Sequence, residues 1–124
     1  MSLLTTDVSN PLGTKVATES FGKASVINQI DPTAGTIYQI EVNNSGGAAV
    51  FLKLWEGVSQ APTVGSDAPA HIFRCLGSSS FSLSIPGGWA YTTALWAAVV
   101  EGNGGTAGTT DPVKSVTYSI RYTT

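Results

Sequence analysis

The chain has 124 residues, which suits a single domain with a hydrophobic core of its own. Only 11% of the residues are charged, against about 25% in an average protein, and a net charge of −2 leaves no basic stripe for nucleic-acid phosphates. The single cysteine excludes an intrachain disulfide, and no apolar run is long enough to span a bilayer.

The first 20 residues are polar, contain Pro11 and Gly13, and show no sustained periodicity. They predict an extended N-terminal arm over residues 1–20, followed by a folded domain over residues 21–124. They also lack the pattern of a signal peptide, so we expect no secretory export. Three apolar residues of the arm are candidate interface residues, namely Leu3, Leu4 and Val8.

Short strand patterns separated by turn residues follow the arm. Residues 24–30 form the first, and residues 36–42 the second, where alternation places Tyr38, Ile40 and Val42 on one face. Residues 49–56 alternate in the same way after an Asn- and Gly-rich turn. These patterns predict half-buried antiparallel strands.

The second half of the chain continues this pattern after a long loop over residues 57–69. The strands predicted there cover residues 71–76, 81–85, 92–100 and 113–122. Residues 92–100 are almost entirely apolar, which predicts a central strand that is buried on both faces. Pro86-Gly87-Gly88 predicts a turn between the second and third of these strands.

No segment of helical length carries a helical period. Seven or eight short strands with turns between them are typical of an all-β fold, an antiparallel β-sandwich that is jelly-roll-like. We therefore predict this class with the N-terminal arm attached to it.

Residues that could perform chemistry are few and scattered. His71 and Cys75 would lie more than ~12 Å apart along a strand, too far to share a metal ion or to form a nucleophile–base pair. The carboxylates fall mostly beside turns, and Asp31 and Asp111 precede prolines, where a short acceptor caps a turn. We expect no catalytic, cofactor or metal site and no enzyme, although two turn carboxylates paired as in a glycan hydrolase remain an alternative.

The segment Gly102–Ala107 matches the glycine pattern of a dinucleotide-binding loop. That function needs a helix after the loop, so that the N-terminus of the helix can face the pyrophosphate. The residues that follow, through Pro112, lead instead to another strand pattern. A hairpin loop is the better interpretation.

The three tryptophans offer the remaining candidates. Trp55 and Trp96 lie in strand patterns, where core packing is the expected role. Trp89 follows the Gly-Gly turn and could be an exposed anchor for a partner or a platform for a sugar ring. Together with Tyr91, it completes the set of candidate interface residues.

Three stretches of the chain resemble small virion structural proteins of tailed bacteriophages. They are Thr36–Asn44 (TIYQIEVNN), Phe51–Glu56 (FLKLWE) and the loop Ala61–Pro69 (APTVGSDAP), which is the most specific. The apolar strand Thr93–Val100 after a Gly-Gly turn extends the resemblance to about 90 residues. The chain departs from the pattern at Arg74-Cys75, and residues 1–20 lie outside it.

This resemblance implies a β-sandwich on the virion, most commonly a head decoration (cement) protein on the capsid surface, assembled in the host cytoplasm. The expected partners are the major capsid protein, contacted between its subunits, and further copies of the chain in a homotrimer. A low charge fits such contacts, because few ions lose their water when the surfaces meet. The alternative is a tail, neck or fibre module that binds a host-surface glycan or receptor through Trp89 or Tyr91. Neither role implies a cofactor.

Overall fold

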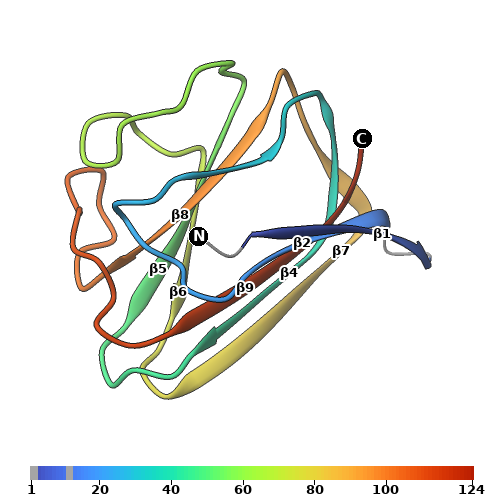
Figure 1. The fold of residues 1–124 in the computed structure, drawn as a ribbon. Coiled ribbons are helices and arrows are strands. Elements are labelled where there is room, and N and C mark those ends of the chain that lie inside the picture. The colour runs from blue at the N-terminus through green and yellow to red at the C-terminus, as the bar shows by residue number, and fades with distance from the viewer. Residues whose placement is uncertain (1–2, 11–12) are drawn as a thin grey trace.

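The computed structural model describes residues 3–10 and 13–124, and within these ranges it contains strands and no helix (Figure 1). The strands are β1 (Leu4–Asn10), β2 (Gly13–Glu19), β3 (Asn28–Asp31), β4 (Gly35–Asn44), β5 (Val50–Glu56), β6 (His71–Cys75), β7 (Ser79–Tyr91), β8 (Leu95–Glu101) and β9 (Val116–Thr123). Every pair of neighbouring strands is antiparallel. The predicted all-β sandwich is confirmed.

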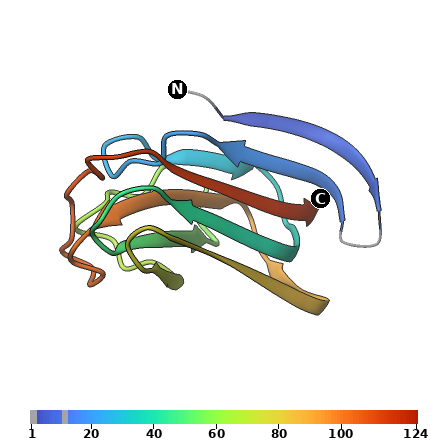
Figure 2. The ribbon, with the colours of Figure 1, turned by 90° about the horizontal axis from the view of Figure 1, so that it is seen from below.

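Two sheets form the layers of the sandwich (Figure 2). The larger sheet has the order β1-β2-β9-β4-β7, and the smaller sheet has the order β3-β8-β5-β6. Apart from the β1–β2 and β5–β6 hairpins, each connection passes from one sheet to the other. This alternation is compatible with the jelly-roll variant of the sandwich.

The N-terminal segment differs from the predicted arm. Its described residues form a hairpin within the larger sheet, in which β2 lies between β1 and β9. Ala17 and Glu19 of β2 are fully buried. The sequence does not predict this strand, because the positions that alternate toward the interior are Lys15, Ala17 and Glu19, which do not form an apolar face. A domain boundary at residue 20 would cut through the sheet.

The core forms where the inner faces of the two sheets meet. In β9, Val116, Tyr118, Ile120 and Tyr122 are buried and alternate with partly exposed residues, as the sequence predicts. All residues of β8 from Leu95 to Val100 are buried, because β8 is covered on its inner face by the larger sheet and on its outer face by loops. The apolar run therefore marks a strand buried on both faces.

A bulge changes the predicted pattern where β4 pairs with β7 and β9. The register shifts between Ile37 and Gln39, so Ile40 and Val42 face the core while Tyr38 does not. On the facing strand, Pro86-Gly87-Gly88 is this irregularity within β7 rather than the predicted turn. Gly87 and Gly88 have φ values of 80° and 79°, which explains why glycines occupy the bulge.

Candidate functional site

Most carboxylates among the described residues accept hydrogen bonds from loops of the protein itself. Asp31 Oδ1 accepts a hydrogen bond from the amide of Thr33 at 3.0 Å, as a turn cap should. Asp111 accepts hydrogen bonds at 2.8 Å from both the amide and the hydroxyl of Ser25. The amides of Thr63 and Thr92 donate in the same way to Asp67 at 2.7 Å and to Glu56 at 2.8 Å. These acids therefore have structural partners.

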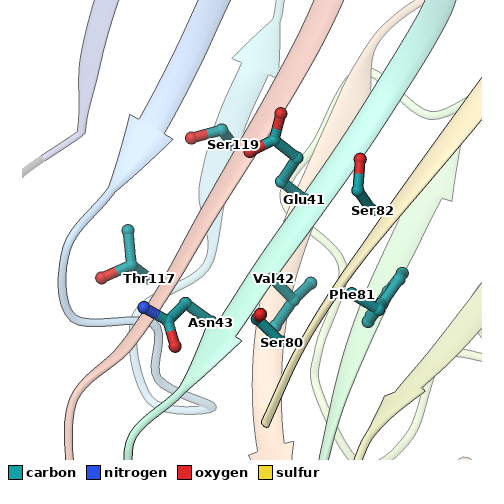
Figure 3. A pocket seen from close by; sticks show the side chains of 8 residues that line it. All are labelled: Glu41, Val42, Asn43, Ser80, Phe81, Ser82, Thr117 and Ser119. Carbon is teal, nitrogen blue, oxygen red and sulfur yellow. The ribbon is translucent and has the colours of Figure 1, made fainter.

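Glu41 differs from these acids. It lies in the middle of β4 on the outer face of the larger sheet, where it is exposed and accepts no hydrogen bond from the described residues. Its register partners on the two sides are Ser82 of β7 and Ser119 of β9. The carboxylate is thus presented to solvent between two small hydroxyl side chains (Figure 3).

A shallow cavity of about 470 Å³ surrounds Glu41. We call it the Glu41 hollow, and its lining residues are Glu41, Val42, Asn43, Ser80, Phe81, Ser82, Thr117 and Ser119. Figure 3 shows the polar side chains of β4, β7 and β9 on one side of the sheet, while Val42 and Phe81 pack toward the core. One carboxylate, one amide and four hydroxyls therefore form a surface rich in hydrogen-bonding groups.

The predicted interface residues do not lie together. Leu4 is 64% exposed on β1, Leu3 is half-buried against the core, and the side chain of Val8 lies outside the described part of the structure. Trp89 and Tyr91 belong to β7, at the opposite edge of the same sheet. The four candidates with described side chains therefore lie at two opposite edges of the larger sheet.

The side chains of Trp89 and Tyr91 are also less exposed to solvent than an exposed anchor would be. Tyr91 is buried, and its hydroxyl donates a hydrogen bond to Oδ2 of Asp31 at 2.5 Å. Trp89 is half-buried, with its ring against the rings of His71 and Phe73. Phe73 in turn packs on Phe81, with ring centroids 6.4 Å apart, so these aromatic rings close the side of the sandwich between β6 and β7. Trp89 and Tyr91 thus both make packing contacts within the sandwich.

Two long loops cover the outer face of the smaller sheet. The 57–70 loop lies over two tryptophans, because Trp55 Nε1 donates to the carbonyl of Asp67 and Trp96 Nε1 to that of Val58, each at 3.0 Å. The 102–115 loop lies over Lys53, which is fully buried beneath it. This second loop contains the glycine pattern at 102–107 and leads into β9, so the helix that a dinucleotide site needs does not follow it.

The described residues do not gather a metal-binding group of three or more His, Cys, Asp or Glu side chains. His71 and Cys75 lie at the two ends of β6. Cys75 is buried, and burial raises the pKa of its thiol. Within the part of the chain that the structure describes, no helix is long and apolar enough to cross a membrane.

Comparisons with protein families, with curated proteins and with solved structures found no match to this chain. The function is therefore inferred from its own residues. The sequence signal for the Glu41 hollow consists of polar positions in three alternating strands, namely Glu41 and Asn43, Ser80 and Ser82, and Thr117 and Ser119. Only the strand order places these pairs side by side.

Proposed function

We propose that the protein is a structural protein of a tailed-phage virion, namely a capsid decoration (cement) protein that binds on the head surface between major capsid subunits. The resemblance of Thr36–Asn44, Phe51–Glu56 and Ala61–Pro69 to phage virion proteins gives the biological setting. The observation that carries the proposal is the outer face of the larger sheet around the Glu41 hollow. This face offers surface area and hydrogen-bonding groups, with a single carboxylate, that of Glu41, at the centre of the hollow.

Such a face suits docking on another protein. Desolvation of its hydroxyl and amide groups costs little free energy if the partner offers hydrogen bonds. Desolvation of a highly charged face would cost much more. The strands hold the side chains in fixed positions, so less conformational entropy is lost on binding. Asn43 and Ser80 lie opposite each other in the register, and their side chains have no hydrogen-bond partner among the described residues.

The negative charge of Glu41 indicates which groups a partner would present to this face. A carboxylate without an internal partner gains most from a lysine, an arginine or a pair of backbone amides. We therefore place such a donor of the major capsid protein over the Glu41 hollow. Additional copies of the chain on the same head would add binding strength through multivalency.

The test is co-sedimentation of the purified protein with undecorated heads of the phage that encodes it. Glu41→Lys should weaken binding at least about tenfold, because it reverses the charge at the centre of the face. The matched control is Gln60→Lys, which makes an exposed residue of the 57–70 loop basic. Failure of the unchanged protein to bind heads would refute the decoration role, and equal binding by Glu41→Lys would refute the docking face.

The Glu41 hollow also favours a second candidate, a tail, neck or fibre module that binds a host-surface glycan. A carboxylate flanked by an amide and hydroxyls can accept and donate hydrogen bonds to sugar hydroxyls. The two aromatic residues that the sequence suggested for this role, Trp89 and Tyr91, contribute little accessible surface. Binding on a glycan array that Glu41→Gln abolishes, without binding to heads, would favour this candidate.

A further inference from the structure

The strand β7 forms one edge of the larger sheet, with β4 on one side and no described strand on the other (Figure 2). Residues 79–84 form its regular part, because each of them pairs in continuous register with β4 before the bulge at residues 86–88. In such a strand, alternate residues direct their N–H and C=O groups away from the sheet. This edge can therefore accept another strand.

The four edge strands of the sandwich differ in how well they are protected. β3 has four residues and a bulge, β6 has five residues with an exposed Arg74, and β1 contains Asp7 and an irregular register. The strand β7 has 13 residues and no charged side chain. Natural proteins usually protect edges with charges, prolines or short strands. The regular part of β7 has none of these protections.

The sequence of this edge is complementary to itself. An antiparallel pairing of two copies about Ser82 places residues 80–84 opposite the same residues of the second copy, which uses five of the six residues of the regular part. Ser80 then lies opposite Ser84 of the second copy, on the outer face. On the inner face, Phe81 lies opposite Leu83. A shift of the register by one residue would bring serines against apolar side chains along the whole pairing, which disfavours it, whereas the proposed register has this combination only at its ends, where Ser79 meets Ile85.

Leu83 provides a second reason for this pairing. Its register partner is the fully buried Ile40, so Leu83 points toward the interior side of the sheet, yet it remains 37% exposed because no strand lies beyond it. In the paired arrangement, Phe81 of the second copy would cover it. Burial of this apolar surface favours association, and no like charges meet along the two strands.

We propose that β7 pairs antiparallel with β7 of a second copy about a twofold axis at Ser82, which joins the two larger sheets into one continuous sheet. Because each copy has one β7, this contact closes after two copies and gives a dimer. The proposal does not rest on the decoration role, although the dimer would present two Glu41 hollows on one continuous face.

The contact is smaller than a standard interface, since one strand pair contributes most of it. A stable interface usually buries about 1,200–2,000 Å². We therefore expect a reversible dimer with a Kd of about 10 µM, in the range of small interfaces. Sedimentation equilibrium of the purified chain from about 1 to 200 µM should show conversion of monomer to dimer around this Kd. A species that stays monomeric throughout, or a trimer, would overturn the proposal.

A charge-swap experiment tests the register. Ser82→Lys and Ser82→Asp should each be monomeric, because two like charges would meet at the twofold axis, while an equimolar mixture should form a heterodimer. Thr6→Lys, which makes an exposed residue of the other edge strand of the same sheet basic, is the control that should still dimerise. Circular dichroism of each variant checks that it is folded. Dimers of Ser82→Lys alone, or a mixture that remains monomeric, would refute pairing at Ser82.

Discussion

The ammonium group of Lys53 donates a hydrogen bond to the carbonyl oxygen of Gly105 at 2.7 Å, across the interface between β5 and the 102–115 loop. A second hydrogen bond reaches the carbonyl of Gly108 at 3.2 Å. The side chain is fully buried, and burial lowers the pKa of its ammonium group. Beside it, Gly104 lies against the ring of Phe51. One cation and one aromatic ring of β5 thus contact the loop, in addition to the hydrogen bonds that join it to Glu101 and Ala49.

Lys53→Met should release the loop with little loss of global stability. The substitution removes two hydrogen bonds to the loop but also removes a buried charge, and the two effects on the free energy of unfolding nearly cancel, to within about 1 kcal/mol. Amide hydrogen exchange in residues 102–110 should accelerate about tenfold or more. Unchanged exchange, or a global loss above about 3 kcal/mol, would contradict this account of the loop.

The contact between Tyr91 and Asp31 predicts a loss of stability in alkali. Burial of Tyr91, followed by its hydrogen bond to Asp31 and the charge of that residue, raises the pKa of the tyrosine hydroxyl above its ordinary value of 10.0. Above about pH 10 the unfolded chain therefore loses a proton that the folded chain retains, and the free energy of unfolding decreases as pH rises. The stabilisation is fully present below that pH.

Tyr91→Phe tests this relationship. It should lower the free energy of unfolding by about 1–3 kcal/mol at neutral pH, because the buried Asp31 loses a donor. It should also reduce the decrease in stability between pH 10 and pH 11, measured by urea unfolding at each pH. A variant with the same alkaline slope as the unchanged protein would exclude Tyr91 as its source.

A second buried network joins Asn28 to Glu19 and Tyr118. The Nδ2 group of Asn28 donates to Glu19 Oε1 at 2.9 Å and to the hydroxyl of Tyr118 at 2.8 Å. Asn28→Ala should lower the free energy of unfolding by about 1–3 kcal/mol, because it removes the shared donor. Asn28→Asp is the matched variant and should be less stable still at pH 7, where two carboxylates would face each other. Urea unfolding that ranks the two variants in the opposite order would contradict the network.

Some of this structure could be predicted from alternation alone. The buried face of β9 and the two-sided burial of β8 follow directly from the sequence, because their apolar residues match the environments of the two strands. The turn at Asp31-Pro32 also follows, since a carboxylate before a proline has few other roles. In these places local chemistry and tertiary environment agree.

Other features depend on contacts that sequence alone does not specify. The inward positions of β2 include Lys15 and Glu19. Because these residues are charged, the sequence of β2 does not show the apolar–polar alternation that predicts a strand. The bulge opposite Tyr38 reverses the expected face of that residue. The Glu41 hollow exists only because the fold places β4 between β9 and β7, which are distant in the chain. The site therefore depends mainly on the strand order, which the sequence pattern does not specify.

The packing of His71 on Trp89 leads to a last prediction, for mildly acidic conditions. Burial lowers the pKa of His71 below its ordinary value of 6.5, and the charge of Glu56 opposes this only in part. Below about pH 6.5 the unfolded chain thus binds a proton that the folded chain binds less readily, so the free energy of unfolding falls as pH falls. His71→Phe retains an aromatic ring beside Trp89 and Phe73 but cannot be protonated. Urea unfolding between pH 7.5 and pH 5 should show a smaller decrease for this variant than for the unchanged protein, and equal slopes would show that His71 does not set the acid sensitivity of this edge of the sandwich.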